Sequence, residues 1–295
     1  IKRCVKVLGF VNCTDDFAQQ PQVINGGSNV QYGEGQVTGR HLLVGGEAAG
    51  NHYFTVRAVR KAVRFLKTMN APRYEGSYWA IIHPDCSYDI QDDPDWKRPH
   101  EYKDTSNIYD DEIGKIAGVR FIETTEAKVF HADDLTEGAR DLTVKSASSK
   151  VLTVNEAITT ADAAKLAGRE VVIGGALLEI ESATAAGAGS ATITLKEAPA
   201  ATPTASTTIY PGEAGAKGRN VYSTLIMGAE AYGTTELTGG GLEHIVKPLG
   251  SAGTADPLNQ RATVGWKATK VAERLVEAYM IRVETTSTFD ETPLT

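Results

Sequence analysis

The clearest hydrophobic periodicity in the chain predicts an amphipathic helix over residues 55–70. Its apolar positions recur at spacings of three and four, which place them on one helical face: Val56, Val59, Val63 and Leu66. Thr55 is a suitable N-cap, and Pro72 follows where the helix has to end, because proline cannot continue a helix. We therefore expect these four apolar side chains to be buried.

The other faces of this helix carry five cations and no acid. These are Arg57, Arg60, Lys61, Arg64 and Lys67. Like charges at helical spacing destabilise a helix, so we expect compensating negative charge from outside it. Two sources fit: phosphate, or carboxylates of this chain or of a neighbouring copy. We favour carboxylates, in particular those of the acidic stretch 92–111, because a net charge of -7 supplies many of them.

Other apolar runs predict strands. Residues 77–83 form a run expected in a strand that is buried on both faces, whereas residues 119–123 alternate as in a half-exposed strand. Further strands are expected later in the chain, at 222–227, 262–268 and 280–284. A short helical stretch up to Tyr279 is expected to lead into the last of them. Together these patterns predict an α+β fold.

The two ends of the chain lack such patterns. Residues 1–50 are rich in glycine and predict irregular structure, and the polar tail from Thr285 is expected to be frayed. Because the first residue is Ile1 rather than a methionine, we expect a processed or incomplete amino terminus.

The composition changes abruptly at about residue 135. From there to about residue 218 the chain is rich in Ala, Thr, Gly and Ser, with a helical stretch at 161–167 among short β-like runs. The runs lie at 142–144, 151–154, 170–173, 177–180, 191–195 and 207–210. Short strands at regular spacing predict a small barrel or sandwich. We expect residues 135–218 to be a β-rich domain inserted into a core made of residues 1–134 and 219–295.

Composition and charge narrow the class of protein. The chain has 295 residues, of which 41% are hydrophobic and 23% charged, and these fractions are ordinary for a globular protein. A net charge of -7 means that any contact with nucleic acid has to be local. The three cysteines, Cys4, Cys13 and Cys86, have no CxxC spacing, and we expect reduced thiols. No apolar run approaches the ~20 residues of a membrane span, so no membrane contact is expected.

Two clusters contain residues that could carry chemistry. His83 and Asp85 flank a proline, and the more economical interpretation is that the proline ends a strand, since no nucleophile or second histidine stands at a matching spacing. His131 with Asp133 and Asp134 could ligate a divalent ion, but adjacent polar residues at a domain junction are more often a solvated turn. We expect no catalytic residue, no metal site and no cofactor.

Two further motifs resemble known ligand-binding loops but lack residues that those loops require. The acidic group Asp92, Asp93 and Asp95 lacks the glycine and terminal glutamate of an EF-hand, and we interpret it as a charged loop for subunit contact. Residues 212–217 contain two glycines and a lysine but lack the Gly-Lys-Ser/Thr ending of a P-loop.

Four ordered blocks carry a family resemblance. They are KAVRFLKTMNAP at 61–72, YWAIIHPD at 78–85, EIGKIAGVRFIETT at 112–125 and TVGWKA at 263–268. In order and spacing these blocks closely resemble the major capsid protein family typified by coliphage N-four, whose fold is of the HK97 type. The blocks bracket about half of the chain, and four blocks in order are more specific than any one motif.

The resemblance implies an HK97-like capsid fold. The helix at 55–70 would be the long spine helix of a peripheral domain, and segments after residue 220 would contribute to an axial domain. The sequence departs from the family in two places. We expect most of the amino-terminal arm and extended loop that precede the spine helix in this family to be absent here, and we expect residues 135–218 to form an insert.

The function implied is structural and not enzymatic. The family's subunits assemble in the bacterial cytoplasm into hexamers and pentamers of an icosahedral shell, with scaffold, portal and decoration proteins as further partners and with weak, non-specific contact to packaged DNA. The alternative is a β-rich adhesion or carbohydrate-binding protein of the virion surface. The insert offers few aromatic platforms for sugars beyond Tyr210. A hydrolase that uses His83 and Asp85 is disfavoured by the lack of a nucleophile motif.

Overall fold

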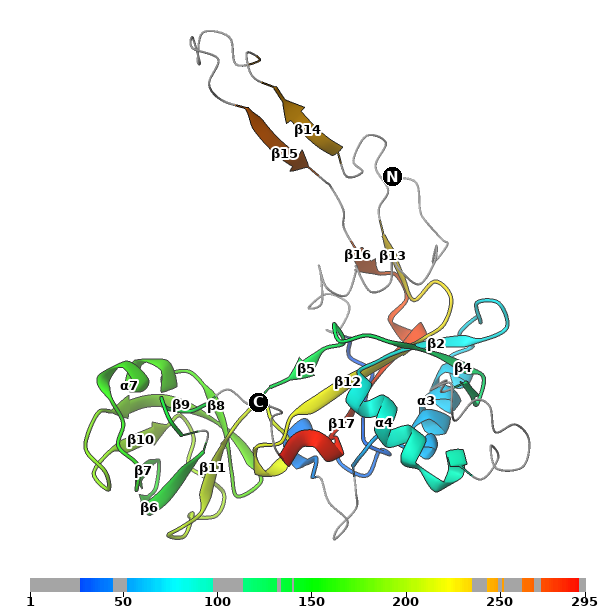
Figure 1. Cartoon of the computed structure of the whole chain (residues 1–295). Coiled ribbons are helices and arrows are strands. Elements are labelled where there is room, and N and C mark those ends of the chain that lie inside the picture. The colour runs from blue at the N-terminus through cyan, green and yellow to red at the C-terminus, as the bar shows by residue number, and fades with distance from the viewer. Residues whose placement is uncertain are drawn as a thin grey trace.

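The computed structural model of the chain has a central sheet with helices, a separate β-barrel and a projecting hairpin (Figure 1). It describes residues 27–44, 52–97, 114–131, 134–139, 141–234, 243–248, 251, 262–267 and 272–291. The fold class is mixed α+β, as predicted.

The predicted amphipathic helix is α3 (Val56–Thr68), and all four predicted apolar positions are buried. The Thr55 side chain caps it by accepting a hydrogen bond from the Ala58 amide at 3.2 Å. Asp93 adds a second cap, because its carboxylate accepts from the Val56 amide at 2.9 Å. A negative group at this end also complements the helix dipole. The helix is therefore fixed at its start by two side chains from different parts of the chain.

The central sheet joins segments from both ends of the chain. Its order is β1 (Val30–Tyr32), β17 (Met280–Thr285), β12 (Val221–Met227), β2 (Tyr78–Ile82), β4 (Val119–Glu123) and β3 (Lys115–Ile116), and β5 (Val129–Phe130) also pairs with β12. The β1–β17 and β2–β4 pairs are parallel, and the others are antiparallel. The strands predicted at 77–83, 119–123, 222–227 and 280–284 are thereby confirmed.

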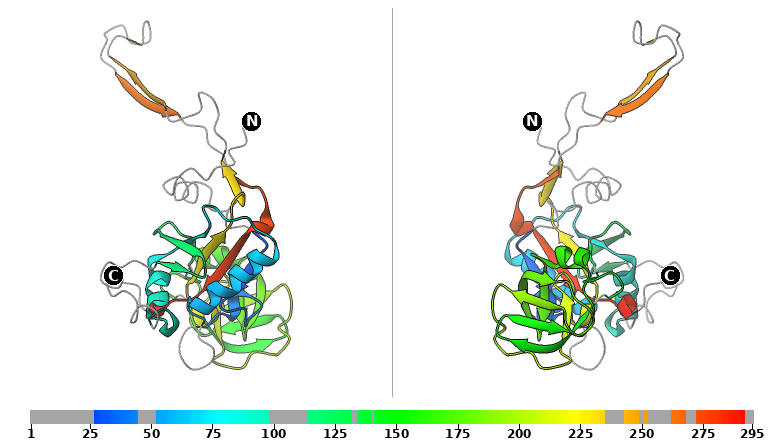
Figure 2. Two further views of the ribbon diagram at one scale, coloured as in Figure 1. Left: turned by 90° about the vertical axis from the view of Figure 1, so that its right-hand side faces the viewer. Right: turned by 90° about the vertical axis from the view of Figure 1, so that its left-hand side faces the viewer.

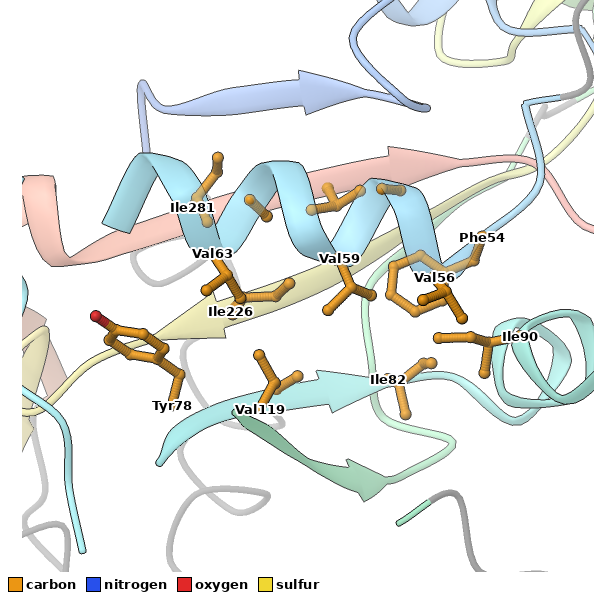
Figure 3. Packing of buried hydrophobic residues seen from close by; sticks show 14 of the residues in the cluster. Phe54, Val56, Val59, Val63, Tyr78, Ile82, Ile90, Val119, Ile226 and Ile281 are labelled. Atoms are coloured by element: carbon orange, nitrogen blue, oxygen red, sulfur yellow. The ribbon is translucent and has the colours of Figure 1, made fainter. Parts of the chain in front are cut away.

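The sheet buries apolar side chains on both of its faces. On one face α3 packs its apolar stripe on β12, β17 and β2, where Val59 and Val63 approach Ile226 and Ile281 (Figure 3). The other face buries a second cluster around Leu225. Strands β12 and β17, which the resemblance assigned to an axial domain, thus pack directly against the predicted spine helix. The division into peripheral and axial parts stays a prediction.

The six strands predicted between residues 135 and 218 are present and form a closed barrel. They are β6 (Leu142–Ser148), β7 (Val151–Val154), β8 (Glu170–Ile173), β9 (Ala176–Thr184), β10 (Thr192–Leu195) and β11 (Thr208–Pro211). The helix predicted at 161–167 is α7 (Thr160–Leu166). Their buried residues form one apolar cluster of their own, and the barrel lies beside the sheet (Figure 1).

A hairpin projects from the opposite end of the body. Strands β14 (Glu243–Lys247) and β15 (Thr263–Lys267) pair in it, and a shorter pair, β13 (Tyr232–Thr234) with β16 (Ala272–Arg274), forms its base. The hairpin stands clear of the body in all three views (Figures 1 and 2). The strand predicted at 262–268 is β15 and is confirmed.

Pro84 was expected to end a strand, and β2 does end at Ile82, but Pro84 also begins the helix α4 (Pro84–Asp92), which was not predicted. Proline is well suited to the first helical position, where its missing N–H would have no partner anyway. His83 is the N-cap, since its Nδ1 accepts from the Asp85 amide at 3.3 Å. The charged loop expected at Asp92, Asp93 and Asp95 is also wrong in part, because Asp92 ends this helix and Asp93 caps α3.

Three smaller expectations are corrected as well. Residues 1–50 are not irregular throughout, because β1 pairs with β17. The stretch expected to be helical up to Tyr279 is the strand β16 followed by a short 3-10 turn, η4 (Glu277–Tyr279). The tail is not frayed from Thr285, because residues 285–287 are fully buried and the 3-10 turn η5 (Thr288–Glu291) follows. Predictions for Cys4, Cys13, residues 98–113 and Asp133 lie outside the described residues.

Candidate functional site

Two of the five cations of α3 are engaged within the subunit. Arg57 Nε lies 3.3 Å from the carboxylate of Glu34, and the Lys61 ammonium donates a hydrogen bond to the Glu34 carbonyl oxygen. The same carboxylate accepts from the Thr55 hydroxyl at 3.0 Å. Glu34 thus lies beside the positive end of the helix and compensates the cations on that side.

The other three cations line a hollow beside the helix. Arg60, Arg64 and Lys67 are spaced four and three residues apart, so they lie on one exposed helical face. The hollow has a volume of about 480 Å³ and is completed by Val63, Thr68 and Ala117. Within the described ranges, no carboxylate forms an ion pair with any of these three cations.

The far wall of this hollow is a tight turn. Ala117 and Gly118 connect β3 to β4, and both have positive φ values, 52° and 86°. A two-residue turn of this kind matches the twist of the strands that it joins. On the helix side, the Thr68 hydroxyl donates to the Arg64 carbonyl oxygen at 2.9 Å. The hollow is therefore walled by secondary structure on both sides.

In the described part of the acidic stretch that was expected to neutralise the helix, Asp93 contacts α3. Asp93 caps the first turn of α3, whereas Asp92 pairs with Lys97. The part of the stretch at 98–111 lies outside the described residues. In the described part of the chain, the counter-charge for α3 comes mainly from Glu34, which the sequence analysis did not single out.

His83 and Asp85 lie together with Tyr222. The Tyr222 hydroxyl donates to Asp85 Oδ2 at 2.6 Å, and the two rings of His83 and Tyr222 are 5.0 Å apart. Burial lowers the pKa of His83, and the nearby His131 lowers it further, whereas Asp85 and Glu123 act in the opposite direction. A neutral His83 can accept the hydrogen bond that caps α4. The geometry therefore supports a structural role for this pair.

The remaining motifs have packing explanations. Gly212 and Gly215 stand where a Cβ atom would come within 2.6 Å of the Glu170 carbonyl oxygen and within 2.7 Å of the Leu43 carbonyl oxygen. These glycines allow close backbone approach, which accounts for their presence without a phosphate. Asp134 offers its backbone carbonyl to Arg169 at 2.8 Å. Among the described residues, no three His, Cys, Asp or Glu side chains are grouped closely enough to hold a metal ion.

One buried charge cluster was not predicted. Glu284 on β17 is fully buried, and Arg40 binds its carboxylate through two nitrogens at 2.7 and 3.0 Å. Arg282 Nε lies 2.8 Å from the same carboxylate. The Arg40 guanidinium also lies 3.4 Å from the centre of the Phe130 ring. This cluster joins the segment before α3 to β17 and β5, and no local sequence signal relates residues so far apart.

Comparisons with known proteins identify the family to which the sequence is similar. The sequence matches the family described as phage capsid protein over residues 22–235. No curated protein matches the sequence. Among solved structures, the chain is similar to a chain of the acidic stable capsid of Helicobacter pylori bacteriophage KHP30, with a TM-score of 0.44 and 9% identity. The similarity covers 94% of this chain and 66% of the capsid chain. This chain therefore spans less than two thirds of the length of the capsid chain. Within the described residues, no helix is long and apolar enough to cross a membrane.

Proposed function

The chain belongs to the phage capsid protein family, and from that premise we propose that it is a major capsid subunit that self-assembles into the icosahedral shell around phage DNA. The observation that carries this proposal is the family match over residues 22–235, which includes α3, the barrel and most strands of the central sheet. A structural role in the virion capsid follows from the family, and we expect no enzymatic activity.

Within this family, the finer assignment is to the coliphage N-four type with an HK97-like fold. The four sequence blocks that carry the resemblance support it by their positions. They fall on the second half of α3, on β2 and the start of α4, on β3 with β4, and on β15. Three of them therefore meet in the body, where α3 packs on β2 and β4.

The projecting hairpin supports contact between neighbouring subunits. Val246 and Val264 face each other across β14 and β15, and they are 55% and 69% exposed. An isolated two-stranded ribbon is marginally stable in water. A shell of heterologous contacts would cover such a ribbon, with the hairpin of one subunit lying on the next. We infer contact of this kind in the hexamers and pentamers of the shell.

The barrel supports the proposal of an inserted domain at 135–218. The chain enters it after β5 and returns from it into β12, and these two strands pair with each other at Phe130 and Val221. Its apolar cluster is separate from the two clusters of the body. A unit with adjacent ends and its own core fits a decoration carried by the body. Scaffold, portal and separate decoration proteins remain expected partners.

The test is assembly. Full-length protein co-expressed with the structural proteins of its phage should sediment as particles, and negative-stain microscopy should show shells. A matched variant replaces residues 236–270 with a short turn. This turn would connect β13 to β16, which are already antiparallel neighbours. That variant should remain folded as a monomer but should form no particles, because the hairpin contact is lost. If the unaltered protein never sediments as particles or capsomers, the proposal is wrong.

A further inference from the structure

The hollow beside α3 has the composition of an anion site. Its polar lining consists of Arg60, Arg64, Lys67 and Thr68, and the three cations are exposed. Arg57 and Lys61 contact Glu34, whereas the described residues provide no carboxylate for the three in the hollow. Uncompensated like charges at helical spacing destabilise α3, so a bound anion would stabilise it.

The lining disfavours a protein partner. Protein interfaces place apolar or aromatic anchors at their centre, and they are enriched in arginine but depleted in lysine. The apolar residues of the lining are Val63, which is buried under the helix, and Ala117, which is exposed but carries only a methyl group. An acidic protein segment would thus find charge but no apolar or aromatic anchor at the centre of the hollow.

The lining suits a polyphosphate backbone. Phosphate oxygens in nucleic acids are bound mainly by arginine, lysine and hydroxyl side chains. Arg60 to Lys67 extends over about 10 Å of helix axis. One strand of B-DNA passes about three phosphates over that length. Three cations in a row match a contact to the phosphate backbone that is independent of sequence.

We propose that Arg60, Arg64 and Lys67 form a binding site for the phosphate backbone of the enclosed DNA, and that Arg57 and Lys61 serve the fold instead. This inference rests on the proposed function, because a shell subunit meets a genome. It divides the five cations of α3 into two roles. It also departs from the expectation that carboxylates neutralise all five.

The binding test uses the full-length protein and a labelled duplex of mixed sequence. The variant Arg60→Gln/Arg64→Gln/Lys67→Gln is compared with a control that loses the same charge at exposed lysines of the barrel, Lys145→Gln/Lys150→Gln/Lys165→Gln. Affinity is measured by fluorescence anisotropy between about 50 and 200 mM salt. We expect the site variant to bind at least about tenfold more weakly, with a plot of log affinity against log salt less steep by about 2–3. The control should retain most of the slope.

A single change, Arg64→Gln, keeps the test sharp if the triple variant is poorly folded. It should reduce the slope by about 1, as expected for one phosphate contact. Unchanged salt dependence in both site variants would overturn the inference. So would a site variant that binds DNA like the control but no longer assembles, because its cations would then meet a neighbouring subunit. Particle formation by the unaltered protein is scored separately, so a failure of the proposed function can be distinguished from a failure of this site.

Discussion

The barrel and the body of this protein are built on opposite principles. Every strand of the barrel lies between residues 142 and 211 and pairs antiparallel with barrel strands only. The body instead joins Val30 to Arg282 and Leu225 to Ile81, so its sheet closes only when distant segments meet. Contacts close in sequence cost less loop-closure entropy than distant ones. The barrel is therefore the more self-sufficient unit.

The two regions also differ in what they bury. The barrel's cluster is apolar, and the carboxylate of its one buried acid, Asp162, accepts from the hydroxyl of Thr159, the N-cap of α7. The body buries Glu284 between two arginines and also buries Asp89, whose carboxylate accepts from the Thr288 hydroxyl at 2.6 Å. Buried charges tolerate the loss of a partner poorly. The body thus depends on a few specific polar contacts that tie the chain ends together, whereas the barrel does not.

The largest expected effect comes from a charge placed in either apolar cluster. Val63→Asp should unfold the body, because an unpaired buried charge costs several kcal/mol, comparable to the stability of a domain. Ile193→Asp should do the same to the barrel alone. Hydrogen exchange resolved along the chain is the measurement. If each variant loses protection in both regions together, the two cores form one cooperative unit and the comparison fails.

The next largest effect on stability is expected when the buried ion pair of the body is broken, and it is compared with the effect of breaking an exposed ion pair of the barrel. Glu284→Gln leaves Arg40 and Arg282 without their carboxylate and should lower the free energy of unfolding by about 3–5 kcal/mol. Glu179→Gln breaks the exposed pair with Lys196 and should change it by less than about 1 kcal/mol. Chemical denaturation measures both. Equal effects would mean that Glu284 does not hold the chain ends together.

A smaller effect is expected when the barrel is removed. Replacing residues 135–218 with a short Gly/Ser linker should leave the body folded, because Phe130 and Val221 already lie opposite each other. The cost should be up to about 2 kcal/mol, since Leu43 loses its contact with the segment at 214–216 and becomes partly exposed. A single cooperative melting transition is expected, and its loss would show that the barrel is part of the body's core.

The smallest effect concerns pH. Burial lowers the pKa values of His83 and His52, so the folded state favours their neutral forms. Their contribution to stability is complete above the unfolded pKa of about 6.5 and decreases as the pH falls through it. His83→Asn keeps an N-cap but cannot titrate. Its melting temperature should therefore fall less than that of the parent between about pH 7.5 and 5.5.

The contribution of His83 is given by the difference in pH dependence between the parent protein and the His83→Asn variant. His52 remains in both, and Asp89 acts with the opposite sign, because burial raises its pKa and its stabilising protonated form is lost as the pH rises. Identical pH dependence in parent and variant would exclude protonation of His83 as a source of acid sensitivity.

Helices and strands with a regular local pattern could be predicted from the sequence. The period of Val56, Val59 and Val63 predicted α3, and regular short runs predicted all six barrel strands. The five cations were found because they lie on that same helix. The start of α4 was missed because Pro84 was interpreted as the end of a strand and not as the first residue of a helix.

Features that depend on distant contacts were not predictable. Strand β1 has only three residues, and only its pairing with β17 makes it a strand. Residues 285–287 of the polar tail are buried, and Thr288 after them donates to the buried Asp89, a contact that no local pattern indicates. The same holds for the site. Glu34 pairs with Arg57, whereas Ala117 lies across the hollow from the exposed cations. Both residues are far from α3 in sequence, and only the tertiary fold brings them next to it.

The central claim is that the body builds the shell while the barrel is carried on it. Electron microscopy of particles assembled from full-length protein, with and without residues 135–218, tests this most directly. We predict closed shells of the same diameter from both proteins, with α3 and the central sheet in the wall and with the barrel seen as separate density that disappears on deletion. Failure of the full-length protein to form shells, or barrel density lying within the wall and bridging subunits, would contradict the account.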